Sequence, residues 1–117
     1  MSESVIRTKS KDFAKNIILL CRKLSTNHVE FALINQLLRA GTSIGANVYE
    51  AQYAQSTKDF ISKLEIALKE CNETAYWLEL LFETNTITID EFETCKKDYT
   101  ELRRMIVSSI TTLKKKL

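Results

Sequence analysis

The spacing of apolar residues is the feature that most constrains how this chain can fold. Long stretches place apolar or small residues at alternating steps of three and four, most clearly in the run Ile34, Leu37, Gly41, Ile44, Val48 and Ala51. Such a run forms a stripe along one side of a helix, and the alternation is typical of helices that pack side by side at a shallow angle. The spacing therefore predicts a bundle of long helices.

The same spacing divides the chain into four helices, at approximately residues 5–25, 28–54, 57–84 and 89–116. The other three stripes are Phe13, Ile17, Leu20, Cys21 and Leu24; Leu64, Leu68, Cys71, Ala75, Leu78 and Phe82; and Phe92, Cys95, Tyr99, Leu102, Ile106, Ser109 and Leu113. Connections of about two to five residues make consecutive helices antiparallel neighbours. We expect an all-α, antiparallel up-down-up-down four-helix bundle, with residues 1–117 as a single domain.

Glycine and proline usage supports this fold class. The chain has no proline and two glycines, which argues against a sheet protein with many turns. Both Gly41 and Gly45 lie inside the second helix, where each glycine costs about 1 kcal/mol relative to alanine. We therefore expect them to allow a close approach to another helix, at the height of residues 64–69.

Capping signals precede three of the four helices. Thr88 with Glu91 has the pattern of a capping box, and Ile87 with Phe92 has that of a hydrophobic staple. The corresponding signals for the third and second helices are Ser56 with Asp59, and Asn27 with Glu30.

Opposite charges on the second and third helices are expected to face each other. If the two helices meet near residue 55, positions whose numbers add to about 110 lie at one height, which places Arg39 opposite Glu70 and Glu73. The alternative is a solvated pair contributing under about 1 kcal/mol. Asn47 and Glu50 continue the polar stripe of Arg39, either as a solvated face or as a contact.

The third helix carries more apolar surface than one stripe needs. Its surplus residues are Ile66, Tyr76, Trp77 and Leu80. A second apolar face of this kind favours packing against another chain. The alternative is that neighbouring helices of the same chain cover it.

The sequence lacks the signals of an enzyme, a metal site or a membrane protein. His28 is the only histidine and lies in an expected turn, and the widely spaced Cys21, Cys71 and Cys95 form no CxxC pair. We expect three buried thiols, no cofactor and no enzymatic activity, although Glu70 and Glu73 form a carboxylate pair. No apolar run approaches the ~20 residues of a membrane span, and no secretory signal is present, so we expect a soluble, cytoplasmic protein.

Charge is unevenly distributed behind a net charge of +2. Residues 1–30 carry +3, residues 31–60 are neutral, residues 61–93 carry −6 and residues 94–117 carry +5. The topology places Arg7, Lys9 and Lys11 at one end of the bundle with the C-terminal lysines. The opposite, acidic end is expected to gather Glu79, Glu83, Asp90, Glu91 and Glu93.

These bases suggest a nucleic-acid interface on the first and fourth helices. The candidate residues are Lys96, Lys97, Arg103, Arg104, Lys114, Lys115 and Lys116. They would contact phosphates without reading sequence. The alternative is a solvated face whose terminal lysines match the negative end of the helix dipole. Since no exposed aromatic pair interleaves the bases in the sequence, stacking of single strands is not expected.

Several segments resemble a known family. They are QLLRAGTSIGANVYEA at 36–51, STKDFI at 56–61, IALKE at 66–70 and ETAYWL at 73–78. They are similar to bacterial four-helix-bundle proteins encoded in intervening sequences of large-subunit ribosomal RNA genes. This family is related to accessory variability determinants of diversity-generating retroelements.

The resemblance implies a homopentamer without enzymatic activity. It implies a role in helix or subunit packing for Arg39, Asn47, Glu50, Glu70 and Glu73. The pattern of small and apolar residues assigns Gly41, Gly45, Tyr76 and Trp77 to packing as well. RNA or DNA is the partner that it favours. The alternative is a scaffold or accessory subunit that docks a protein such as a reverse transcriptase, without contacting nucleic acid.

Overall fold

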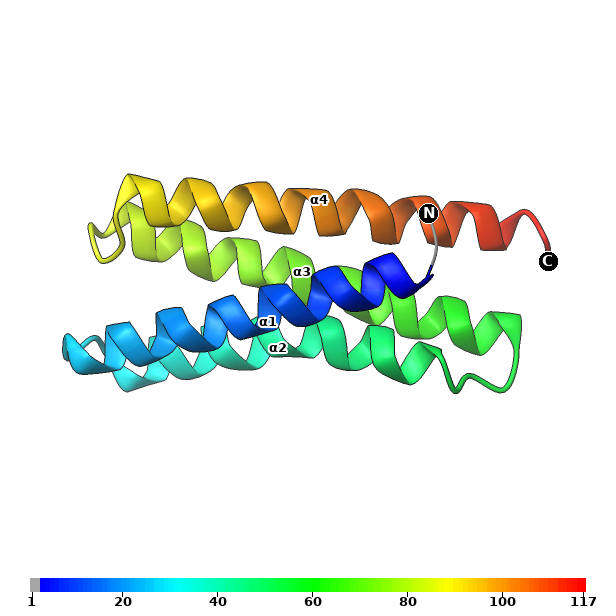
Figure 1. The fold of residues 1–117 in the computed structure, drawn as a ribbon, viewed down its shortest axis with the longest axis horizontal. Coiled ribbons are helices and arrows are strands. Elements are labelled where there is room, and N and C mark those ends of the chain that lie inside the picture. The colour runs from blue at the N-terminus through cyan, green and yellow to red at the C-terminus, as the bar shows by residue number, and fades with distance from the viewer. Residues whose placement is uncertain (1–2) are drawn as a thin grey trace.

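Four helices form the fold of the computed structural model, which describes residues 3–117, with side chains from Val5 onward. They are α1 (Glu3–Thr26), α2 (Phe31–Ala51), α3 (Thr57–Glu83) and α4 (Ile89–Lys114). Consecutive helices pack together and α4 returns beside α1, so the chain runs up, down, up and down (Figure 1). The described molecule measures 47 × 21 × 19 Å. The predicted all-α antiparallel bundle is confirmed; residues 1 and 2 of the predicted domain lie outside the described part.

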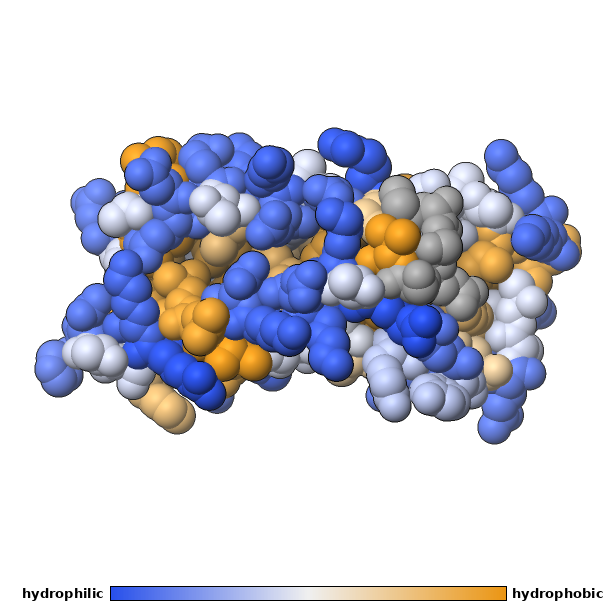
Figure 2. Space-filling model, in the orientation of Figure 1, coloured by the Kyte–Doolittle hydropathy of each residue, from blue (hydrophilic) through white to orange (hydrophobic). Residues whose placement is uncertain are grey.

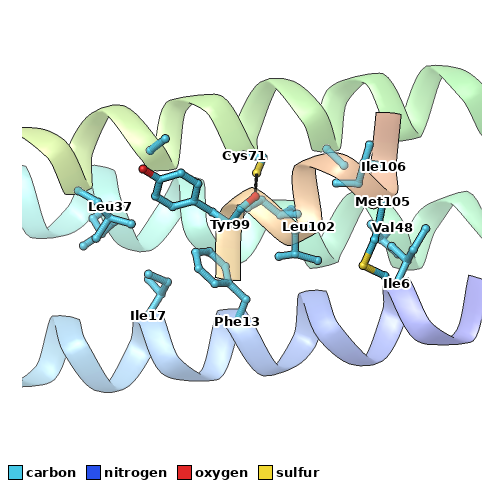
Figure 3. Packing of buried hydrophobic residues seen from close by; sticks show 14 of the residues in the cluster. Ile6, Phe13, Ile17, Leu37, Val48, Cys71, Tyr99, Leu102, Met105 and Ile106 are labelled. Atoms are coloured by element: carbon cyan, nitrogen blue, oxygen red, sulfur yellow. Dashed lines mark hydrogen bonds between the residues drawn. The ribbon is translucent and has the colours of Figure 1, made fainter. Parts of the chain in front are cut away.

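The predicted stripes form the core, with one shift near the end of α4. Ile17, Leu37 and Ile106 are fully buried, and side chains from all four helices meet around them (Figure 3). In α4 the core continues through Met105 and Ile110, whereas the predicted position, Ser109, is only half-buried. A straight helix advances 3.6 residues per turn, so its buried side drifts away from a strict 3.5-residue repeat.

The predicted caps of α3 and α4 are present. Thr88 Oγ1 accepts a hydrogen bond from the Glu91 amide at 3.1 Å, and Glu91 Oε1 accepts one from the Thr88 amide at 2.8 Å. This is the complete capping box, and the staple residues on either side of it are buried. At the start of α3, Ser56 Oγ accepts from the Asp59 amide at 3.1 Å.

The predicted bounds of the second helix, residues 28–54, are too wide. His28 has a φ of 59°, a left-handed conformation that separates α1 from α2, and the N-cap is Glu30, which makes no side-chain capping bond. The predicted cap at Asn27 is therefore wrong. At the other end, the amides of Tyr53 and Ala54 bond three residues back, at 3.0 and 3.1 Å. The chain leaves α2 in tighter turns of the 3₁₀ type.

Both glycines of α2 lie where α1 comes close. A Cβ built on Gly41 would lie 2.8 Å from Cγ2 of Ile17, and one on Gly45 would lie 3.3 Å from the carbonyl oxygen of Ser10. Ser10 is itself buried, and its hydroxyl donates to the Arg7 carbonyl at 3.2 Å. The expected close approach is present, and its partner is α1. Side chains at these positions would push the two helices apart.

Replacing Gly41 with alanine is expected to lower the free energy of unfolding by about 1 kcal/mol. Overpacking a core costs about 1–3 kcal/mol, and alanine returns about 1 kcal/mol of helix propensity. Urea unfolding followed by circular dichroism measures the change. Adding Ile17→Leu, which removes the β-branch facing Gly41, should recover part of the loss. Equal or higher stability of Gly41→Ala would show that the approach is not a steric constraint.

Candidate nucleic-acid interface

Two of the candidate bases on α4 lie over aromatic rings, and one of them also contacts α3. The Lys96 ammonium lies 5.9 Å from the centroid of the Phe92 ring, and the Arg103 guanidinium lies 5.7 Å from that of Tyr99. Arg103 also donates to Oδ1 of Asn72 on α3 at 3.3 Å. Lys96 is exposed and Arg103 is half-buried, so both keep their charge near solvent while their stems pack against rings, and only Arg103 also contacts α3.

The other two bases, Lys97 and Arg104, form the outward face of α4. Both are exposed and, together with Lys96, line a shallow hollow of about 440 Å³ that also includes Glu93 and Glu101. Glu101 is already paired, since its carboxylate lies 2.6 Å from Nζ of Lys9 on α1. The hydrogen bond from Lys9 lowers the pKa of Glu101, and Lys97 and Arg104 add a smaller effect of the same sign. Positive charge therefore remains in excess around this hollow.

The three C-terminal lysines differ in their contacts. Lys114 pairs with Glu65 of α3 at 3.2 Å, whereas Lys115 is the C-cap of α4 and Lys116 follows it. Both are exposed and pair with no carboxylate within 4.0 Å in the described part of the chain. As predicted, they lie at the end of the bundle where α1 begins (Figure 1).

Among the side chains from Val5 onward, two ion pairs join α1 to α4. One is the pair between Lys9 and Glu101, and the other, near the opposite end, joins Lys23 to Glu91 at 2.7 Å. The Lys23 ammonium and the Thr88 amide lower the pKa of Glu91. The surface over both helices is mostly hydrophilic, apart from an apolar patch between the end of α1 and the start of α4 (Figure 2). Polar contacts thus help to close the bundle along this seam.

The predicted charge match between α2 and α3 is present. Arg39 Nη1 lies 3.3 Å from Oε1 of Glu70, and Nη2 contacts the carboxylate of Glu73. The hydrogen bond from Arg39 lowers the pKa of Glu73, whereas burial, followed by the neighbouring Glu73, raises the pKa of Glu70. One guanidinium therefore holds two adjacent carboxylates, which would otherwise repel each other.

The remaining residues predicted to take part in packing do not all contact another helix. Glu50 pairs with Lys63 of α3 at 3.5 Å, but the amide of Asn47 donates to the Ser43 carbonyl within α2, at 2.8 Å. On α3, Tyr76 meets Trp77 edge-on, with ring centroids 5.0 Å apart.

The surplus apolar face of α3 remains partly open to solvent. Tyr76 is 56% exposed and Ile66 is 39% exposed, while Trp77 and Leu80 are half-buried. Neighbouring helices of the same chain thus cover only part of this band.

The structure corrects the expectation that no exposed aromatic pair lies among the bases. Tyr49 and Tyr53 are 60% and 71% exposed, and their ring centroids lie 5.5 Å apart. Arg7 and Lys11 of α1 lie across a groove that Tyr49 also lines. The sequence carried a signal, since the two cations on α1 and the two tyrosines at the end of α2 are each four residues apart. Interleaving within one segment does not reveal a pairing between two segments.

The cysteines are free thiols. Cys71 is buried and donates to the backbone carbonyl of Tyr99 (Figure 3). Cys21 is also buried and donates to the carbonyl of Ile34. Cys95 is half-buried, whereas the sequence predicts a buried thiol. Burial raises the pKa of each thiol to about 11, so all three stay protonated at neutral pH.

Residues 3–117 contain neither a cluster of metal ligands nor a membrane-spanning helix. No group of three or more histidine, cysteine, aspartate and glutamate side chains is arranged to hold a metal ion. None of the helices combines the length and apolar character needed to cross a membrane.

Comparison with known proteins agrees with the fold. The sequence model of the 23S rRNA-intervening sequence protein family matches residues 2–108. A crystal structure of a protein with unknown function from the S23 ribosomal protein family of Bacteroides thetaiotaomicron is 49% identical, with a TM-score of 0.92. That likeness covers 95% of this chain and 99% of the other. No significant match is found among curated proteins. The resemblance to intervening-sequence proteins is confirmed.

Replacing Arg39 with glutamine is expected to lower the free energy of unfolding by about 1 kcal/mol at neutral pH, because two carboxylates lose their shared cation. Without Arg39 the folded-state pKa of both carboxyls rises. The free energy of unfolding of the variant should therefore approach that of the wild type as the pH falls through about 4.3, where protonation of the carboxylates removes their repulsion. Urea unfolding across this pH range measures the difference.

The matched control for Arg39→Gln is Glu50→Gln, which breaks an exposed pair that holds no second carboxylate. It should change stability by under about 0.5 kcal/mol at any pH. A loss for Arg39→Gln that does not depend on pH would argue against the shared-cation explanation.

Proposed function

We propose that this chain, which belongs to the 23S rRNA-intervening sequence protein family, is a non-enzymatic cytoplasmic protein that binds nucleic acid through α1 and α4. One observation carries the proposal: the bases of α4 are largely uncompensated. Of the seven bases in residues 94–117, only Lys114 has a carboxylate within 4.0 Å among the described side chains. Exposed positive charge without a partner in the protein is suited to a phosphate backbone.

The arrangement of the bases favours contact without sequence readout. Lys97 and Arg104 lie two turns apart on the outward face of α4, and Lys115 and Lys116 extend the positive surface to the end of the helix. Lys9 adds to this by pairing with Glu101, which removes a negative charge from the same face. Such a surface would hold phosphates of DNA or RNA, and the strength of binding would depend steeply on salt.

We further propose that the protein assembles as a homopentamer. The support is the partly exposed apolar band on α3, which includes Ile66 and Tyr76. Apolar surface of this kind is stabilised when a second copy covers it. Assembly would also repeat the basic face of α4 around a ring, and so raise its affinity for a long polyanion.

Light scattering is expected to give a mass about five times the chain mass of 13.5 kDa. Ile66→Glu should shift the mass toward one chain, because the contact would bury an unpaired charge. The matched control is Val107→Glu, since Val107 is also partly exposed but lies on α4. A single-chain mass for the wild type would exclude the pentamer.

Binding to duplex DNA and to an RNA hairpin is expected to weaken steeply with salt. Lys97→Gln with Arg104→Gln should weaken binding and reduce the slope of log affinity against log salt by about two, because each phosphate contact contributes about one. Fluorescence anisotropy measures both quantities. Lys96→Gln with Arg103→Gln should have a smaller effect on binding, because both cations already lie over aromatic rings and Arg103 also donates to Asn72.

The charge-matched control is Lys58→Gln with Lys69→Gln, which neutralises two exposed bases of α3 and should leave the slope unchanged. Equal effects of all three double variants would point to net charge instead of a defined surface. A flat salt dependence would contradict the proposal. Co-purification of a protein partner that survives nuclease treatment, without any binding of nucleic acid, would favour the scaffold function.

A further inference from the structure

We propose that the groove between α1 and α2 is a second site, which binds single-stranded nucleic acid. Its bases would stack on Tyr49 and Tyr53, and its phosphates would contact Arg7 and Lys11. This inference rests on the proposed function for the class of ligand, but it uses a different surface and a different contact. The α4 surface offers charge alone, whereas this groove combines charge with exposed aromatic rings.

The groove exists because α1 and α2 lie close together at small residues. Its volume is about 510 Å³, and Thr8, Ala14, Thr42, Gly45 and Ala46 are among the residues that line it. Gly45 is the residue at which a Cβ would meet the Ser10 backbone of α1. Short side chains cannot fill the space above the contact, so the larger residues stand along its edges. The groove is thus shaped by the backbone, without a rearrangement of side chains.

The two tyrosines present an unusual amount of aromatic surface. They remain 60% and 71% exposed although apolar rings gain by burial. Their planes are tilted by 51° instead of stacked on each other, which leaves ring faces open to a ligand. Each phenol can accept any base on its face, since stacking does not depend on base identity. The neighbouring Tyr49 hydroxyl raises the pKa of Tyr53, so the Tyr53 phenol is neutral at physiological pH.

Two unpaired cations complete the site. Arg7 and Lys11 are exposed, and neither has a carboxylate within 4.0 Å among the described side chains. Both cations line the same groove as Tyr49. Arg7 and Lys11 are about one helical turn, or 5.4 Å, apart on α1. Tyr49 lies in the last turn of α2, and Tyr53 follows in the 3₁₀-type turn after Ala51, so a pair of phenols at the end of α2 accompanies a pair of cations near the start of α1.

This arrangement of two cations and two phenols favours a single strand over a duplex or a protein as the occupant of the groove. A duplex keeps the faces of its bases stacked inside, so exposed phenols gain nothing from it. A protein partner would gain from the rings, but the two adjacent cations, with no carboxylate within 4.0 Å among the side chains from Val5 onward, are complementary to a polyanion. Stacking platforms next to a positive groove are the general solution for strands whose bases are splayed out.

The test compares a labelled oligothymidylate of about 15 nucleotides with a duplex of equal length, by fluorescence anisotropy on the full chain. Tyr49→Leu with Tyr53→Leu should weaken binding of the single strand roughly tenfold or more, and leave duplex binding unchanged. Tyr49→Phe with Tyr53→Phe keeps both ring faces and should bind like the wild type. Phe31→Leu, at an exposed aromatic residue at the other end of α2, is the matched control and should also bind like the wild type.

Circular dichroism and light scattering show whether each variant keeps its helices and its assembly. Unchanged single-strand binding by the leucine variant would overturn the inference, as would an equal loss for duplex. A changed mass of the leucine variant would assign this face to contact between copies, and would overturn it too. If the wild type binds duplex alone, only this inference fails. If it binds neither ligand, the proposed function fails as well.

Discussion

The close contact between α1 and α2 determines how the rest of the bundle is arranged. Gly41 has no side chain because Ile17 occupies the space that a Cβ would need. The glycine lowers helix propensity by about 1 kcal/mol, and dispersion contacts between the closely packed helices offset this loss. With α1 drawn toward α2, the seam between α1 and α4 has the sparser packing, and the ion pairs of Lys9 and Lys23 span it.

Much of the fold could be predicted from the sequence because its determinants are local or periodic. The apolar stripes predicted which residues are buried, and Thr88 with Glu91 predicted the start of α4. Antiparallel packing with a short connection also relates residue numbers on α2 to those on α3. That relation is enough to predict Arg39 opposite Glu70 and Glu73 from the sequence, and the structure has both contacts.

The features that could not be predicted depend on which helices touch and how closely. The glycine pattern indicated a close approach, but a pattern in one helix does not name its partner, which is α1. The late start of α2 depends on the left-handed conformation of His28, which a histidine adopts only in a particular turn. The tyrosine pair and its cations come from different helices, so their proximity follows only from the height of α1 against α2.

The choice of helices that the ion pairs join explains how a chain with a net charge of only +2 presents a basic surface. Helix α3 is acidic and lies beside the basic segment 94–117, so the two could have neutralised each other. Instead, α2 takes the carboxylates of Glu70 and Glu73 through Arg39, and only Glu65 pairs with α4 among the described side chains. In turn, α1 pairs with Glu101, one of the two acids in residues 94–117. Acids of α3 and α4 are thus held by α1 and α2, and the bases of α4 remain available to a ligand.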